Sequence, residues 1–228
     1  MGIKNTKETK YYIVIPAYNE EQVIGSVIEE LYSVGYRNII VVDDGSTDNT
    51  YRKAAEKKIV LLRHILNRGK GAAIKTGLEA ARLLNAEHVV TFDADGQHDP
   101  KDIRQMIKLL DDYDVVLGQR DFSDKHIPFF KRMGNFVGNF VTWVVYGLWV
   151  ADSQSGMRAY SKKALVCMET TADRYEYDSE ILREIVRNKL SYIETPIHVR
   201  YTTYSQKKAD RQTYIGAVKT VIRMILAD

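Results

Sequence analysis

The chain has 228 residues, of which 45% are hydrophobic and 28% are charged, and its formal net charge is +3. This length and composition suit one globular domain with a sizeable core, and so small a positive charge gives no reason to expect a nucleic-acid partner. A single cysteine, Cys167, excludes an internal disulfide, and no apolar run reaches the roughly 20 residues that a membrane-spanning helix needs.

Short apolar runs alternate with amphipathic segments over the first half of the chain. The run 11–15 predicts a strand that Pro16 closes, and Asn19 is expected to cap a helix that ends at Gly35. A second strand, 38–42, precedes a helix that Ser46 or Thr47 would cap. The elements expected next are a strand at 59–62, a helix at 70–84, a strand at 87–92, a helix at 100–110 and a strand at 113–117.

This alternation changes after residue 120. Residues 121–176 are aromatic-rich and interrupted by glycine, so irregular structure is expected there. A helix at 177–188, a strand at 192–199 and a basic amphipathic tail helix at 211–226 complete the prediction. The pattern predicts an α/β domain, a Rossmann-like and mostly parallel sheet with helices on both faces, and a single domain over 1–228.

Polar motifs follow the first four expected strands, where parallel strands present their carboxyl ends to ligands. They are Pro16-Ala17-Tyr18-Asn19-Glu20, Asp43-Asp44-Gly45-Ser46, Asn67-Arg68-Gly69-Lys70-Gly71 and Asp93-Ala94-Asp95-Gly96-Gln97. The Gly-Lys-Gly that enters a helix is expected to offer backbone N–H groups and a cation to phosphate. The two carboxylates of the fourth motif suit Mg²⁺ or Mn²⁺ held together with a diphosphate.

In order and spacing, these four motifs resemble the inverting glycosyltransferases of family 2. The similarity spans residues 11 to about 205, and Asp152-Ser153-Gln154-Ser155-Gly156-Met157-Arg158-Ala159-Tyr160 resembles the acceptor-side segment of the branch that makes dolichyl- or polyprenyl-phosphate sugars. The resemblance implies a type A glycosyltransferase (nucleotide-diphospho-sugar transferase) fold. It also implies a donor half at 11–120, an acceptor half at 121–205 and a basic tail at 206–228.

The resemblance assigns roles to individual residues. Those expected to bind the donor are Pro16, Tyr18, Glu20, Asp44, Lys70, Asp93, Ala94, Asp95, Gln97, Arg120, Arg200 and Lys207. Asp93, Asp95 and Gln97 are the expected metal site for Mg²⁺ or Mn²⁺, and Asp95, Arg120 and Arg132 are expected to act in catalysis. Lys207-Lys208 stands where related chains often have glycine, so this part of the motif is altered.

The sequence is compatible with two classes of acceptor, a phosphate and a hydroxyl. A lipid phosphate such as dolichyl or polyprenyl phosphate is already ionised and needs cations rather than a base, with GDP-mannose or UDP-glucose as the type of donor. A glycan hydroxyl needs a general base, for which Asp178 and Glu180 are the candidates. A third interpretation is a non-catalytic protein that binds nucleotide sugars.

A lipid acceptor leads us to expect a peripheral protein at the cytoplasmic face of a membrane. Phe129, Phe130, Lys131 and Arg132 precede the uncharged run 136–150, and aromatic residues beside cations suit an anionic lipid surface. Core packing is the first expectation for 136–150 and membrane contact is the alternative. A membrane-protein partner or a homo-oligomer is also compatible with the sequence.

Overall fold

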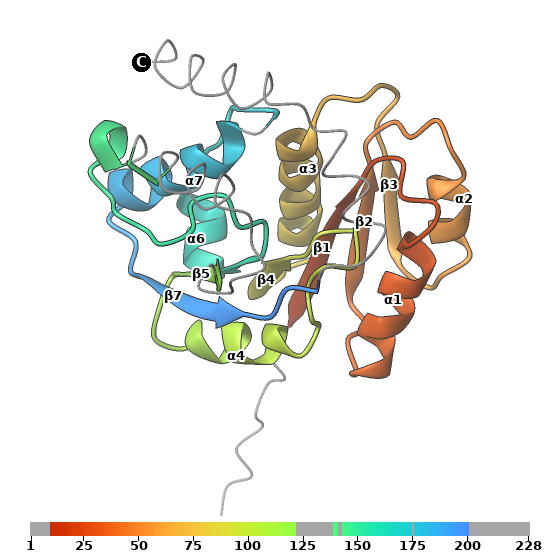
Figure 1. The fold of residues 1–228 in the computed structure, drawn as a ribbon, viewed down its shortest axis with the longest axis horizontal. Helices are drawn as coiled ribbons and strands as arrows, with labels where there is room; N and C mark the ends of the chain where they lie inside the picture. Colours follow the sequence, from red (N-terminus) through yellow and green to blue (C-terminus); the bar gives the residue numbers. More distant parts are fainter. Residues whose placement is uncertain (1–9, 122–138, 141–142, 175, 201–228) are drawn as a thin grey trace, which may run out of the picture.

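The computed structural model describes residues 10–121, 139–140, 143–174 and 176–200. Seven strands form one sheet in the order β3-β2-β1-β4-β6-β5-β7 (Figure 1). They are β1 (Tyr11–Ala17), β2 (Ile39–Asp43), β3 (Val60–Arg63), β4 (His88–Thr91), β5 (Val115–Arg120), β6 (Arg158–Ser161) and β7 (Tyr192–Ile197). β6 is antiparallel to β4 and β5, and the other pairings are parallel. The predicted α/β class with a mostly parallel sheet is therefore confirmed.

Helices cover both faces of the sheet, because alternate side chains of each central strand enter different cores. Ile13 and Ile15 of β1 pack with α1 (Ile24–Ser33), α2 (Thr50–Ala55) and α4 (Asp102–Leu109). Tyr12 and Val14 pack with α3 (Lys70–Leu83), α6 (Lys162–Cys167) and α7 (Glu176–Arg187), which lie together on the opposite side of the sheet (Figure 1). Ile13, Val14 and Ile15 are each 0% exposed.

The central pair β1–β4 sets the position of the site. The chain leaves β1 through α1 on one face, and it reaches β4 through α3 on the other face. Connections that diverge from adjacent strands leave a crevice at their carboxyl ends, which is where open α/β sheets bind ligands. Tyr18 and Asp93 follow these two strands.

The strand β6 and the helix α6 form within the segment that the sequence predicted to be irregular. β6 begins with Arg158, which is only 2% exposed, so a buried charge interrupts the apolar pattern of this short strand. Ala159 pairs with Val90 of β4 on one side and Val116 of β5 on the other, which fits a small residue between two larger ones. The expected tail helix 211–226 lies outside the described residues.

Among the described residues, no helix combines the length and the apolar character that a membrane span would need.

Candidate active site at the carboxyl edge of the sheet

Polar residues in the loops after β1 and β2 form hydrogen bonds between the two loops and do not cap the helices that follow. The backbone N–H of Asn19 donates to Ser46 Oγ at 2.9 Å, and the N–H of Thr47 donates to Asn19 Oδ1 at 2.9 Å. Asn19 adopts a left-handed backbone with φ of 54°, and the helix that it was expected to cap begins only at Ile24. The capping predictions for Asn19, Ser46 and Thr47 were therefore wrong, because the polar side chains found partners across two loops.

These two loops carry the first group of expected donor residues. Pro16 lies within β1, and Glu20 is buried with its backbone N–H donating to Thr50 Oγ1 at 2.7 Å. Tyr18 is 42% exposed at the carboxyl end of β1, so its ring is available to a ligand. Their contacts with a nucleoside remain a prediction.

Asp44, which follows β2, is buried and organises the neighbouring loop. Its carboxylate accepts hydrogen bonds from the backbone N–H groups of Arg68 at 3.0 Å and Gly69 at 2.7 Å. His64 Nδ1 lies 2.7 Å from the same carboxylate, and His64 Nε2 lies 2.9 Å from Thr76 Oγ1. A ring that donates to Asp44 through Nδ1 accepts the Thr76 hydroxyl proton at Nε2. Asp44 therefore fixes the start of α3, and its predicted contact with ribose or base would use the remaining capacity of the carboxylate.

Two backbone N–H groups at the beginning of α3, those of Gly69 and Ala72, already have partners within the protein, and the predicted phosphate contact of the Gly-Lys-Gly motif remains a prediction. The Gly69 N–H is taken by Asp44, and the Ala72 N–H donates to the backbone oxygen of Asp173 at 2.9 Å. A Cβ added to Gly71 would stand 2.6 Å from Tyr177 Cβ and 2.9 Å from the backbone oxygen of Ala172, so α7 and the loop before it pack directly on this turn. These N–H groups are satisfied within the protein, and the Lys70 ammonium is the part of the motif that faces the acidic site.

Lys70 and Asp93 form an ion pair at the centre of the carboxyl edge. Lys70 Nζ lies 2.6 Å from Asp93 Oδ1, and His98 Nε2 lies 3.3 Å from Asp93 Oδ2. Burial alone would raise the pKa of Asp93, but the Lys70 ammonium and His98 hold it well below its usual range. Burial alone would lower the pKa of Lys70, but Asp93, Asp178 and Asp95 together raise it. Both groups are therefore charged near neutral pH.

Asp95 closes the turn that follows Asp93, and these two carboxylates form the acid pair of the site. Its Oδ1 accepts the backbone N–H of Gln97 at 3.0 Å, and Gly96 between them has φ of 73°, which a residue with a side chain adopts less readily. Ala94 is 3% exposed and packs in the core, so it fixes the backbone between the two carboxylates. The chain thus presents Asp93 and Asp95 from one short, well-supported turn.

The acid pair suits a divalent cation that also binds phosphate. Mg²⁺ sites of this kind take one or two carboxylates and complete their coordination with substrate phosphates and water. A cation already lies against Asp93 in the form of the Lys70 ammonium, so the site attracts positive charge. Within the described ranges, no three of the His, Cys, Asp and Glu side chains gather to form a complete metal cluster. Metal binding by Asp93 and Asp95, with Gln97, remains a prediction.

Arg120 and Arg200, two of the expected arginines, have protein partners. Arg120 Nε and Nη2 lie 2.6 and 2.8 Å from the two carboxylate oxygens of Asp152, in a bidentate pair. Arg200 Nη1 donates to Glu30 Oε1 at 2.6 Å, and the Arg200 N–H donates to the Gln97 carbonyl oxygen at 2.7 Å. Arg132 and Lys207 lie outside the described residues. The predicted contacts of all four with a donor or acceptor remain predictions.

The structure separates the two carboxylates that were considered as general bases. Glu180 accepts hydrogen bonds from the Thr171 and Ala172 N–H groups, the Thr171 hydroxyl and Arg183. It therefore holds the loop before α7 in place. Asp178 instead lies 3.3 Å from Nη2 of the buried Arg158. Burial raises the pKa of Asp178, although the positive charges of Arg158 and Lys70 oppose this rise.

Three residues that shape this site had no individual role in the sequence prediction. His64 contacts Asp44, and His98 contacts Asp93. Both histidines lie beside the polar motifs at the carboxyl edge, and this position in the sequence is the signal that could have identified them. Gly156 is the third. A Cβ on this residue would stand 2.5 Å from both Asp93 Oδ2 and Lys70 Nζ. The segment 152–160, expected on the acceptor side, thus packs directly against the acid pair.

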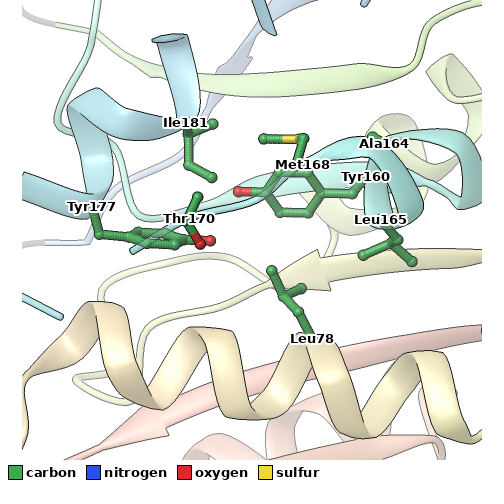
Figure 2. Close-up of a pocket in the computed structure, with 8 residues that line it drawn as sticks. All are labelled: Leu78, Tyr160, Ala164, Leu165, Met168, Thr170, Tyr177 and Ile181. Atoms are coloured by element: carbon green, nitrogen blue, oxygen red, sulfur yellow. The ribbon is translucent and has the colours of Figure 1, made fainter. Parts of the chain in front are cut away.

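A small cavity of about 30 Å³ lies in the core between α3, α6 and α7 (Figure 2). Its lining is mainly apolar, and Tyr160 and Tyr177 contribute their rings to it. Its volume is close to that of a single water molecule, whereas pockets for small ligands usually exceed about 300 Å³. It therefore belongs to the packing of the core and is not a substrate pocket.

Comparison with known proteins agrees with this geometry. The model of the family described as "Glycosyl transferase family 2" matches residues 12–168. A UDP-N-acetylglucosamine–dolichyl-phosphate N-acetylglucosaminyltransferase of Methanococcus voltae is 41% identical, over 86% of this chain and 88% of that protein. An uncharacterised protein of Methanocaldococcus jannaschii is 39% identical, over 98% of this chain and 94% of that protein.

Solved structures share the fold at lower identity. Glucosyl-3-phosphoglycerate synthase from Mycobacterium tuberculosis superimposes with a TM-score of 0.70 at 19% identity, over 96% of this chain and 78% of that chain. The same enzyme in complex with Mn²⁺, UDP and phosphoglyceric acid gives a TM-score of 0.67. At this identity the likeness establishes the type A glycosyltransferase fold.

Proposed function

The chain belongs to glycosyltransferase family 2 and is a hexosyltransferase, and we propose that it transfers a sugar from a nucleotide diphosphate to a dolichyl or polyprenyl phosphate. The observation that carries this proposal is the 41% identity, along almost the whole length of both chains, to an enzyme named for transfer from UDP-N-acetylglucosamine to dolichyl phosphate. UDP-N-acetylglucosamine is accordingly the first donor to test, ahead of the glucose and mannose donors that the sequence suggested.

The proposed reaction needs positive charge more than it needs a base. An oxygen of the acceptor phosphate forms a bond to the anomeric carbon of the sugar. The bond from that carbon to the β-phosphate oxygen breaks, and its electron pair leaves with the nucleoside diphosphate. Attack from the face opposite the leaving group inverts the anomeric configuration. Because the attacking oxygen is already ionised, no proton has to be removed.

The residues at the edge of the sheet suit this task. Asp93 and Asp95, with Gln97, would hold a Mg²⁺ or Mn²⁺ ion, which when bound stabilises the charge that develops on the leaving phosphate. Lys70, Arg158 and Arg120 all act electrostatically on Asp178, and Lys70 contacts Asp93 directly. Such charges offset the repulsion between two phosphate-bearing substrates. Arg132, Arg200 and Lys207 are proposed to add to this group.

The first experiment identifies the product. Purified protein is incubated with Mn²⁺, dolichyl phosphate and UDP-N-acetylglucosamine, UDP-glucose or GDP-mannose, and the lipid fraction is examined by mass spectrometry. We expect a lipid monophosphate carrying one sugar, with UDP-N-acetylglucosamine giving the fastest turnover. Glycan and phosphoglycerate acceptors serve as controls. Turnover with these acceptors and none with dolichyl phosphate would contradict the proposal.

The position of Asp178 favours transfer to a hydroxyl as the second candidate. A carboxylate with a raised pKa beside the acid pair is suited to accept a proton from a sugar hydroxyl. The Asp178→Asn variant separates the candidates in the same assay. Transfer to a phosphate should retain its pH profile, whereas transfer to a hydroxyl should lose at least about 100-fold in kcat, together with the acidic limb on which protonation of Asp178 lowers the rate.

We also propose peripheral contact with the membrane through an aromatic cluster formed by Phe140, Trp143 and Trp149. The ring centroids lie 5.9 Å apart for Phe140–Trp143 and 6.2 Å apart for Trp143–Trp149. These side chains are 45–48% exposed, and Val144 beside them is 62% exposed, so this part of 136–150 does not pack in the core as first expected. Tryptophan side chains favour the headgroup level of a bilayer.

Flotation with vesicles that contain an anionic lipid tests this contact. The double variant Trp143→Ala, Trp149→Ala should lower the fraction of bound protein by about tenfold, because each buried aromatic ring contributes a kcal/mol or more to partitioning. Leu83→Ala, which truncates another exposed apolar side chain at a distant helix end, is the matched control and should bind as the wild type does. Equal flotation of the tryptophan variant would rule out the cluster as the contact.

A further inference from the structure

Lys70 lies among three carboxylates, although only one of them is its direct partner. Its ammonium is 2.6 Å from Asp93 Oδ1, and Asp178 and Asp95 also act on its charge. Gly156 also lies close to the ammonium, since a Cβ there would stand 2.5 Å from the Lys70 nitrogen. The ammonium thus occupies the position from which a cation neutralises the acid pair.

A divalent ion bound to Asp93 competes with this ammonium. Mg²⁺ approaches a carboxylate oxygen to about 2.1 Å, which leaves little room for an ammonium at hydrogen-bond distance from the same oxygen. Lysine has a flexible stem and three donors, so it can exchange one anionic partner for another. A donor diphosphate that arrives with the metal is such a partner.

From this geometry we propose that Lys70 is an exchangeable internal counter-ion. It neutralises Asp93 in the unliganded protein, yields that carboxylate to the divalent ion, and transfers its ion pair to the diphosphate of the donor. The inference rests on the proposed function, because it requires a metal and a diphosphate at this edge. Its consequence is cooperativity: the metal alone has to displace Lys70, whereas with the diphosphate present the displaced ammonium regains a partner.

Reciprocal binding measurements reveal this coupling. The factor by which UDP tightens the binding of Mn²⁺ equals the factor by which Mn²⁺ tightens the binding of UDP, and couplings of this kind are commonly about 5- to 150-fold. Direct coordination of the metal by phosphate supplies part of the factor in any variant. The part due to Lys70 disappears when its charge is removed.

The experiment measures free Mn²⁺ by electron paramagnetic resonance during titration of the protein, with and without UDP and, in parallel, GDP. In Lys70→Met, Mn²⁺ alone should bind about tenfold more tightly than in the wild type. The factor by which UDP tightens the binding of Mn²⁺ should fall by about tenfold. Lys75→Met removes the same charge from the same helix, where Lys75 contacts Asp173 and Thr171, and should change neither value by more than about twofold. Thermal midpoints verify that each variant is folded.

The outcomes separate the inference from the proposed function. Unchanged or weaker binding of Mn²⁺ to Lys70→Met, or an unchanged coupling factor, would overturn the role of Lys70 and leave the glycosyltransferase proposal standing. Equal changes in Lys70→Met and Lys75→Met would also overturn it, because a general effect of net charge would then suffice. Failure of the wild type to bind Mn²⁺ with either nucleotide would overturn both.

Discussion

Replacing Asp95 with asparagine is expected to reduce kcat/KM for sugar transfer by about 100- to 1,000-fold while the protein stays folded. The amide is nearly isosteric, and its oxygen can still accept the Gln97 N–H that Asp95 accepts at 3.0 Å, so the turn is preserved. What is lost is the negative charge that would hold the divalent ion against the leaving phosphate. The assay is transfer to dolichyl phosphate across a series of Mn²⁺ concentrations.

Two further variants make this expectation specific. Asp112→Asn removes the same charge from an exposed turn after α4, and it should transfer at the wild-type rate. Asp95→Ala also removes the oxygen and should lose at least as much activity as the asparagine variant. Full transfer by Asp95→Ala with divalent ions chelated would disprove the metal-dependent mechanism.

Sequence patterns were sufficient to locate this edge of the fold. The strands β1, β2 and β4 are apolar on both faces, so their boundaries are visible, and the polar motifs that follow them must emerge at one edge of a parallel sheet. The acid pair follows β4 directly, and its position depends only on that local order. The strand pattern was therefore enough to locate the edge, and the resemblance to family 2 supplied the roles expected of its individual residues.

Contacts between distant segments were not predictable in the same way. Asn19 and Ser46 have the residue types that cap helices, but they bond to each other's loops because those loops follow adjacent parallel strands. The fold also brings Asp152 against Arg120, a partner that no sequence pattern indicated. In each case a local preference gave way to a partner that only the tertiary structure supplies.

The insertion of β6 between β4 and β5 has the largest consequence for the site. This strand brings the segment 152–160 to the acid pair, although the segment is remote from the pair in sequence and was expected to serve the acceptor. The Thr91 hydroxyl of β4 donates to the Gly156 carbonyl oxygen at 2.8 Å, which fixes the segment beside Asp93. Residues nominated for the donor and residues nominated for the acceptor therefore meet at the Lys70–Asp93 pair.

A single methyl group at residue 156 should consequently impair catalysis. In Gly156→Ala the added Cβ would stand 2.5 Å from Asp93 Oδ2 and Lys70 Nζ and 2.7 Å from Asp93 Oδ1. Lys70 can swing away, but the shorter Asp93 has to shift its carboxylate. Misplacement of a reacting group by about 1 Å can cost about 100-fold in rate, and we expect a loss of that size in kcat/KM for transfer to dolichyl phosphate.

The matched control is Gly25→Ala in the first turn of α1, where no described atom outside the adjoining helix backbone lies within 4 Å of the added Cβ. That variant should keep full activity and gain up to about 1 kcal/mol of stability from helix propensity. Gly156 does not have a left-handed backbone, so alanine introduces no conformational strain of its own and its effect reports on contact with the ion pair. If Gly156→Ala transferred sugar as fast as Gly25→Ala, the acid pair would tolerate displacement, and its geometry could not be what positions the leaving phosphate.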